Sequence, residues 1–413
     1  MLEIHPLRNP IQHYDWGSLT AIPEFLGRTV SDRPVAEVWL GAHPKAPSEV
    51  RIGETWDELN QVLRRDPLRW LGIETGADEA RLPFLLKILA AGKPLSIQAH
   101  PDRRQAQAGF EREDAAGVPR WDAKRNYRDR HHKPEIIYAV SPFTILCGFR
   151  PLEETRRLFE AFGLQGIPPL QALADRQGDD RHGETSGDDG ERLRDFFARL
   201  LLADASTVET WVDQALQRAD AMADGDDGHG FVARWLRHMA AEFPADRGVL
   251  APLFLNLETL KPGQAVYTGP GVLHAYLDGL GIELMANSDN VLRGACTSKH
   301  IDRDELLAIL DPIPRRPCFV DARRSPGVER FLTPSGELGL SKIQVTPEQP
   351  FLCPARSPHR PQILLCTAGE GRVRIENGAS IPFHRDTSFV VPAATGAYRL
   401  EGQGLFFLAE AEP

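Results

Sequence analysis

The chain has 413 residues, of which 42% are hydrophobic and 26% charged, the composition of an ordinary folded protein of two or three domains. Its net charge of -10 and sequence pI near 5.8 argue against nucleic acid and anionic membranes as partners. The first residues lack a basic stretch followed by an apolar run, and the five scattered cysteines form no Cys-x-x-Cys pair. We therefore expect a cytoplasmic protein with reduced thiols.

Short apolar runs separated by turn residues occupy the first 150 residues. The runs lie at 36–40, 97–100, 135–140 and 143–147. Runs of this length, bounded by Gly, Pro, Asn and Asp, are typical of β-strands and predict an antiparallel sheet region. One helix is expected from Trp56 to Leu63, because Thr55 could cap it with Glu58 three residues on.

The spacing of apolar residues changes between about 151 and 249. Apolar side chains recur there at helical intervals, in groups at 193–201, 208–215 and 231–239. The second group is preceded by Ser206, and Glu209 three residues later completes a capping-box pattern. A helical insertion is therefore predicted to divide the β-region.

Strand patterns return after the insertion and contain a weak internal repeat. Residues 263–276 align with residues 385–398, so that His274 faces Gly396. If the repeat reflects two copies of one β-barrel unit, the first copy carries an imidazole where the second has no side chain. The C-terminal hundred residues otherwise hold strands, turns and no ligand cluster, which favours a jelly-roll-like structural module.

Three segments carry side chains that could meet around one metal ion. In the strand at 95–100, the two-residue period places Ser96, Gln98 and His100 on one face. Glu135 begins an extended run directly after a proline, and His274 lies in a stretch that otherwise reads as apolar β-structure. Polar groups in such strands cost free energy unless a metal, a partner or a ligand satisfies them.

The candidate ligands are Gln98, His100, Glu135 and His274. Two nitrogen and two oxygen donors suit Zn2+ or another borderline divalent ion, and they leave positions for water or substrate oxygens. The residue types alone leave a second interpretation open. A histidine on a strand is commonly a hydrogen-bonded core residue, and glutamine is an uncommon zinc ligand.

Two long segments resemble the signatures of a known enzyme family. Residues 127–135, which read Tyr-x-Asp-x-x-His-Lys-Pro-Glu, and residues 274–293 are similar to the two signatures of the type I phosphomannose isomerases. These are the zinc-dependent mannose-6-phosphate isomerases of the cupin superfamily. Segments at 9–17, 36–48 and 86–102 are also similar, so the resemblance spans roughly residues 5–150 and 250–302.

The chain departs from the family pattern at two places. Where the family usually reads Arg-Ala-Gly-x-Thr-Pro-Lys, residues 293–299 read Arg-Gly-Ala-Cys-Thr-Ser-Lys. His131 replaces a common Asn. Neither departure falls on a candidate ligand.

The resemblance implies a mainly β fold of two cupin, or jelly-roll, barrels with an inserted α-helical domain. The catalytic barrel would comprise residues 1–150 and 250–311, and the helical insertion residues 151–249. A C-terminal jelly-roll-like barrel without a metal site would comprise residues 312–413.

The resemblance also implies roles for individual residues. One Zn2+ per chain would be held by Gln98, His100, Glu135 and His274. Arg293 would be the catalytic cation. Substrate or phosphate contact would fall to Lys133, Ser96 and Lys87.

Isomerisation of an aldose to a ketose moves a proton between C2 and C1 through a cis-enediol, so the site must stabilise charge on O1 and O2. A Lewis-acid metal does so directly. Arg293, always protonated and planar, would offset the enediolate charge, while Lys133 would hold phosphate or relay protons. Glu283 and Asp289 are expected to bind substrate or position these groups. The base that removes the C2 proton is open among Lys133, a metal-bound hydroxide, Glu283 and a nearby histidine.

Other functions fit part of the pattern. A non-enzymatic cupin that binds sugar phosphates would use the metal as a structural anchor. An iron-dependent cupin oxygenase would use a facial triad, here His100, Glu135 and His274. For Arg293 itself, the alternative is a surface salt bridge to Glu283 or Asp289. For the isomerase we expect a monomer whose partner is a small sugar phosphate, with no nucleic acid or membrane.

Overall fold

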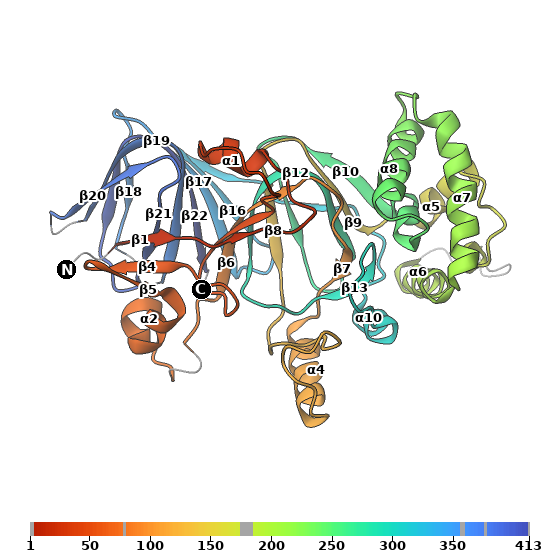
Figure 1. Cartoon of the computed structure of the whole chain (residues 1–413), viewed down its shortest axis with the longest axis horizontal. Coiled ribbons are helices and arrows are strands. Elements are labelled where there is room, and N and C mark those ends of the chain that lie inside the picture. Colours follow the sequence, from red (N-terminus) through yellow and green to blue (C-terminus); the bar gives the residue numbers. More distant parts are fainter. Residues whose placement is uncertain (1–3, 77–79, 174–184, 356–359, 376–377, 412–413) are drawn as a thin grey trace.

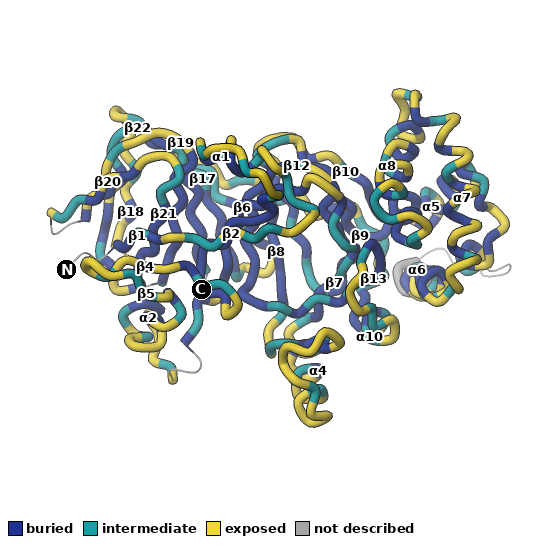
Figure 2. The backbone as a smooth tube through the Cα atoms, viewed as in Figure 1, coloured by how far each residue is buried: buried dark blue, intermediate teal, exposed yellow. Residues whose placement is uncertain are grey.

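The computed structural model describes residues 4–76, 80–173, 185–355, 360–375 and 378–411. Two β-sheets of eleven strands each lie side by side, and a group of helices packs beyond one of them (Figure 1). Figure 2 shows that most strand residues are buried, whereas loops and the outer faces of helices are exposed. The architecture is mainly β with an inserted helical region, which confirms the predicted fold class.

The first sheet, here called the β12 sheet, is organised around β12 (His274–Ala286). Its strands run in the order β14 (Cys318–Phe319), β11 (Ala265–Thr268), β8 (Glu135–Ala139), β12, β6 (Phe84–Ala91), β3 (Glu37–Leu40) and β2 (Ile11–Gln12). Four strands branch from this path: β7 (Ile97–Ala99), β9 (Phe143–Phe149), β10 (Leu255–Leu260) and β13 (Leu292–Ala295). β12 pairs with β7 and β9 in its first half and with β6 and β8 in its second. It therefore touches every strand that carries or adjoins a candidate ligand.

β12 changes its pairing partners close to Gly279, whose φ is +123. The register with β9 shifts between Tyr276 and Asp278, which marks a β-bulge. Successive side chains of a strand alternate between its two faces, so one extra residue reverses the alternation. The bulge therefore lets His274 before it and Glu283 after it point to the same face.

We expect Gly279→Ala to destabilise the protein. An added Cβ would lie 2.5 Å from the carbonyl oxygen of Pro142, and L side chains rarely adopt this backbone conformation. Backbone strain of this kind costs on the order of 1–3 kcal/mol before the clash is added. Thermal unfolding measures the effect, with Gly53→Ala as the control, because Gly53 has a φ of +63 but nothing within 4 Å of an added Cβ. Equal losses of Tm in the two variants would contradict the importance of the close approach.

The second sheet, here called the β22 sheet, is built mainly from C-terminal residues. Its strands run in the order β15 (Arg323–Ser325), β16 (Val328–Leu332), β17 (Leu338–Val345), β22 (Tyr398–Ala411), β19 (Gln362–Ile375), β21 (Ser388–Val391), β1 (His5–Arg8), β4 (Glu49–Ile52) and β5 (Thr55–Glu58), with β18 (Phe351–Cys353) and β20 (Ser380–His384) beside this path. The N-terminal segment thus contributes β1, β4 and β5 to the C-terminal sheet. Between the sheets, the ring centroid of Tyr138 lies 5.4 Å from that of Phe331 and 5.1 Å from that of Phe407.

The helices of the insertion form one group, coloured from yellow to green in Figure 1. They are α5 (Leu152–Ala161), η1 (Pro168–Leu173), α6 (Thr185–Leu202), α7 (Ala205–Met222), α8 (Gly228–Glu242), η2 (Arg247–Leu250) and α9 (Ala251–Phe254). α6, α7 and α8 contain the three predicted apolar groups. Phe149 of β9 packs against Phe197 and Phe254, at centroid distances of 5.8 and 6.3 Å, so aromatic rings join the insertion to the β12 sheet. None of the helices in the described part of the chain is long and apolar enough to cross a membrane.

Two predicted helix starts are wrong. Thr55–Glu58 forms the strand β5 and pairs with β4, so α2 (Leu59–Arg65) begins after the predicted start. α7 is capped by Asp204, whose carboxylate accepts a hydrogen bond from the Thr207 backbone N–H at 2.9 Å, and the predicted cap Ser206 lies inside the helix. The remaining short helices are α1 (Ala21–Leu26), α3 (Pro67–Leu71), α4 (Arg103–Ala115) and α10 (Arg303–Ile309).

The two copies of the weak repeat follow similar paths in the two sheets. In the first copy, β11 leads through a turn into β12, which begins at His274. In the second, β21 leads through a turn, and then past Gly396, into β22. The equivalent path in the C-terminal sheet therefore lacks the imidazole that starts β12.

Candidate metal centre

The register of three short strand segments brings Gln98, His274 and Arg293 together. β7 lies between β12 and β13, and Gln98 is paired with His274 on one side and with Arg293 on the other. Residues directly opposite each other on neighbouring strands have Cβ atoms about 4.5–5.5 Å apart and point to the same face. The amide, the imidazole and the guanidinium therefore form one row.

Three buried side chains, His100, Glu135 and His274, converge next to this row. Nε2 of His100 lies 3.3 Å from Oε1 of Glu135, and Nε2 of His274 lies 3.3 Å from Oε2 of the same carboxylate. The three residues offer ligand atoms that all lie within 4.8 Å of one another. Among the described residues, no other group of His, Cys, Asp or Glu has this geometry.

Hydrogen bonds fix which nitrogen of each imidazole faces the centre. Nδ1 of His100 bonds the carbonyl oxygen of Asn290 at 2.8 Å, and Nδ1 of His274 bonds that of Val272 at 2.9 Å. Because a carbonyl only accepts, each Nδ1 carries the proton and each Nε2 presents a lone pair. Both Nε2 atoms and Oε2 of Glu135 are buried and have no hydrogen-bond partner among the described residues. Such a set of acceptors fits a divalent cation such as Zn2+.

The electrostatic environment keeps these ligands in their metal-binding forms. Burial, and then the charge of Lys133, lower the pKa of His100 to about 4. Burial would raise the pKa of Glu135, but Lys133, whose Nζ lies 3.0 Å from Oε1, and His100 outweigh it and hold that pKa well below the ordinary value. At neutral pH His100 is therefore uncharged and Glu135 is a carboxylate.

We expect the metal-free protein to lose stability between pH 6.5 and pH 4. The pKa of His100 is about 4 in the folded chain and 6.5 ordinarily, so in this window the unfolded chain binds a proton that the folded chain does not. The loss amounts to about 1.4 kcal/mol per pH unit for one proton, or about 3 kcal/mol in all. Thermal unfolding against pH tests it. In His100→Gln, which keeps a donor for the Asn290 carbonyl, Tm should fall less steeply, and parallel curves would contradict the assignment.

A second buried charge cluster lies beside the centre. Nζ of Lys87 lies 2.9 Å from a carboxylate oxygen of Glu283 and 3.3 Å from one of Glu37. Burial alone would lower the pKa of Lys87, but these two carboxylates outweigh it and raise the pKa. The register of β6 explains the contact, because Lys87 is paired with Glu283 of β12 and with Trp39 of β3. Lys87 and Glu283 therefore fix each other's position through a buried ion pair. Sequence reasoning missed Glu37, although it lies in one of the family-like segments.

Ser96, Gln98 and Arg293 are all half-buried, and are thus more accessible than the three converging ligands. Arg293 forms no ion pair within the described residues, so the alternative of a salt bridge to Glu283 or Asp289 is not what the structure shows. Burial and the charge of Arg128 lower the pKa of Arg293, yet a guanidinium stays protonated. An unpaired cation is thus available next to Gln98.

Asp289 has other partners than the expected Arg293. Its carboxylate lies 3.4 Å from Nε2 of His43 and 3.0 Å from Nζ of Lys45. Burial would raise the pKa of Asp289, but His43 and Lys45 outweigh it and lower the pKa. Asp289 therefore anchors the loop that carries His43 and Lys45.

Asn290, a residue that sequence reasoning did not single out, ties the ligand His100 to the loop at 128–131. Its side-chain oxygen accepts from the backbone N–H of Arg128 at 2.7 Å, and its amide donates to the carbonyl of His131 at 2.8 Å. Its own carbonyl holds Nδ1 of His100. Asp129 of the same loop accepts a hydrogen bond from the hydroxyl of Ser288 at 2.8 Å, which also ties the loop to the segment after β12. Both Asn290 and Asp129 lie in the segments that resemble the family signatures, and this position was the sequence feature that could have identified them.

Comparison with known protein families and relatives identifies proteins that are similar to this chain. The model of the phosphomannose isomerase type I catalytic domain matches residues 4–152. The mannose-6-phosphate isomerase of Salmonella typhimurium is 33% identical over 402 residues, which cover 94% of this chain and 97% of that protein. The mannose-6-phosphate isomerase of Escherichia coli is 38% identical over 305 residues, which cover 73% of each chain.

Solved structures extend the likeness to the whole chain. The Salmonella typhimurium mannose 6-phosphate isomerase bound to fructose 6-phosphate and zinc superposes over 100% of both chains, with a TM-score of 0.84 and 31% identity. A zinc-bound holo structure of mannose 6-phosphate isomerase also covers 100% of both chains, with a TM-score of 0.85 and 30% identity. This chain therefore belongs to the type I phosphomannose isomerases.

Proposed function

We propose that the chain interconverts mannose 6-phosphate and fructose 6-phosphate at a zinc centre. The proposed ligands are Gln98, His100, Glu135 and His274. The observation that carries the proposal is the buried convergence of three ligand atoms within 4.8 Å of one another, beside an arginine without an ion-pair partner among the described residues. The matching relatives are mannose-6-phosphate isomerases, and one of them has been solved with zinc and fructose 6-phosphate.

The surrounding residues have separate tasks. Zinc in this centre supplies Lewis-acid polarisation of the sugar oxygens. Arg293, opposite Gln98 on the next strand, offsets the negative charge of the enediolate on O1 and O2. Lys133 lies 3.0 Å from Glu135, which puts its ammonium near the reacting oxygens, where it holds or transfers a proton.

Four further residues were expected to contact substrate. Ser96 is half-buried and lies two residues before Gln98, so it is placed to hydrogen-bond the sugar phosphate. Lys87 and Glu283 are buried in an ion pair with each other, and Asp289 is paired with His43 and Lys45. For these three residues the ion pairs favour a positioning role over direct substrate contact.

A coupled assay for fructose 6-phosphate tests the function directly. The purified protein should convert mannose 6-phosphate, and so should Arg372→Ala, because Arg372 lies in β19 of the other sheet. A protein that binds the sugar phosphate without converting it would favour the non-enzymatic sugar-phosphate-binding function. Dioxygen consumption with iron in place of zinc would favour the oxygenase.

We also propose a cytoplasmic monomer that acts on a small molecule and binds neither nucleic acid nor membranes. The net charge of -10 and the five free cysteines support this proposal. For the domains we keep the three-part division, with a catalytic barrel of 1–150 and 250–311, an insertion of 151–249 and a C-terminal barrel of 312–413. β1, β4 and β5 are the exception, since they pair within the C-terminal sheet.

A further inference from the structure

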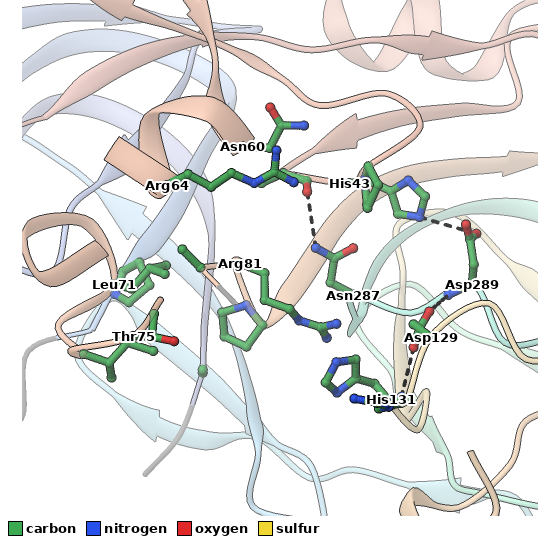
Figure 3. A pocket seen from close by; sticks show the side chains of 18 of the residues that line it. His43, Asn60, Arg64, Leu71, Thr75, Arg81, Asp129, His131, Asn287 and Asp289 are labelled. Carbon is green, nitrogen blue, oxygen red and sulfur yellow. Dashed lines mark hydrogen bonds and ion pairs between the residues drawn. The ribbon is translucent and has the colours of Figure 1, made fainter. Parts of the chain in front are cut away.

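A cavity of about 810 Å³ lies where the β12 sheet meets α2, α3 and the end of β22 (Figure 3). Its walls include Arg64 of α2, Leu71 of α3, Ala411 of β22 and Asn287, which follows β12. None of the four proposed zinc ligands lines it. The volume falls within the range of pockets that hold small ligands.

Arginine dominates the lining of this cavity. The arginines are Arg64, Arg81, Arg120, Arg128, Arg130 and Arg360. Figure 3 shows Arg64 and Arg81 reaching into the same space from separate segments of the chain. Within the described residues, neither of these two side chains forms an ion pair. Arg81 is half-buried, and burial lowers its pKa.

Among the described residues, the carboxylates in the lining are Asp129 and Asp289, and both have partners. Asp129 accepts hydrogen bonds from the hydroxyl of Ser288 at 2.8 Å and from the backbone N–H of Asp289 at 2.9 Å. Asp289 is paired with His43 and Lys45. Among the described residues, the five guanidinium groups of Arg64, Arg81, Arg120, Arg128 and Arg130 therefore outnumber the two occupied carboxylates, in a chain whose net charge is -10.

We propose that this cavity binds a small anion with two or more phosphate groups, at a site separate from the zinc centre. Guanidinium groups bind phosphate oxygens in a bidentate manner. Arg64, Arg120 and Arg130 are exposed, so a ligand can reach them from solvent. Trp121 and Phe110 also line the cavity, under the guanidinium groups of Arg120 and Arg130 at 5.3 and 5.1 Å. These rings position the two guanidinium groups through cation–π contacts.

Arg128 links the cavity to the zinc centre. It lines the cavity, and its charge contributes to lowering the pKa of Arg293. Its backbone N–H is held by Asn290, whose carbonyl holds His100. The two sites therefore adjoin each other at Arg128. Arg293 belongs to the zinc centre and does not line the cavity.

Isothermal titration of the zinc-loaded protein with magnesium pyrophosphate tests the site. A saturating equilibrium mixture of mannose 6-phosphate and fructose 6-phosphate occupies the zinc centre during the titration, and zinc content is measured before and after. We expect one pyrophosphate per chain. Arg64→Gln and Arg81→Gln should each weaken binding by about tenfold or more, the effect of losing one hydrogen-bonding partner of a charged group.

Two controls separate this site from general charge effects and from the zinc centre. Arg65→Gln removes the same charge from the same helix, but Arg65 does not line the cavity and pairs with Asp57, so binding should be unchanged. Arg293→Ala should bind pyrophosphate as the wild type does. Absence of binding, competition with the sugar phosphates, equal weakening in Arg65→Gln or loss in Arg293→Ala would each overturn the proposal. These readings do not depend on turnover, so a failure of the isomerase assay would be a separate result.

Discussion

Arg293→Ala is expected to keep its zinc and lose most of its turnover. The guanidinium lies opposite Gln98 on the neighbouring strand and forms no ion pair among the described residues, so its charge is available to the enediolate. Removal of a comparable oxyanion donor costs on the order of 2.7 kcal/mol or more, which is about a hundredfold in kcat. Steady-state kinetics with mannose 6-phosphate, together with zinc analysis of the same sample, measure both quantities.

A conservative variant sharpens this prediction. Arg293→Lys keeps the positive charge but loses the planar fork, so its turnover should fall between those of Arg293→Ala and the wild type. Zinc loss from Arg293→Ala would assign the residue to metal binding instead. Unchanged kcat in that variant would remove it from the chemistry.

His274→Ala is expected to lose both zinc and activity. Its Nε2 lies 3.3 Å from Oε2 of Glu135 and has no hydrogen-bond partner among the described residues, so this nitrogen is available as a metal ligand. Loss of an outer-shell partner already costs about 10–100-fold in metal affinity, and loss of a ligand should cost more. Equilibrium dialysis against a zinc buffer gives the affinity, and the coupled assay gives the turnover.

The matched control is His238→Ala. His238 is an exposed histidine on α8, where its ring stacks on Trp235, and it lies outside the metal centre. Its removal should leave zinc affinity and turnover unchanged. A fully zinc-loaded His274→Ala protein would remove His274 from the set of ligands.

The sequence predicted much of the candidate centre because strand geometry is regular. The two-residue period placed Ser96, Gln98 and His100 on one face before any tertiary contact was known. The structure brings His100, Glu135 and His274 together from β12 and the ends of β7 and β8. The helices of the insertion could also be predicted, because helical spacing of apolar residues is a strong local signal.

The parts that could not be predicted depend on pairing between distant segments. β1, β4 and β5 join the C-terminal sheet, for example through the pairing of His5 with Val390. No local sequence pattern predicts such a pairing. Asp289 was expected to interact with Arg293, four residues away. In the structure its carboxylate is paired instead with His43 and Lys45, which are distant in sequence. The arginines of the cavity come from α2, two loops and the C-terminal region. Their clustering could therefore not be predicted from a sequence whose net charge is negative.

Turnover of mannose 6-phosphate before and after removal of zinc tests the metal centre most directly. Chelation should abolish the formation of fructose 6-phosphate, and about one Zn2+ per chain should restore it, because the polarisation of the sugar oxygens depends on the metal. Turnover that persists after complete removal of the metal would contradict a zinc-dependent isomerase.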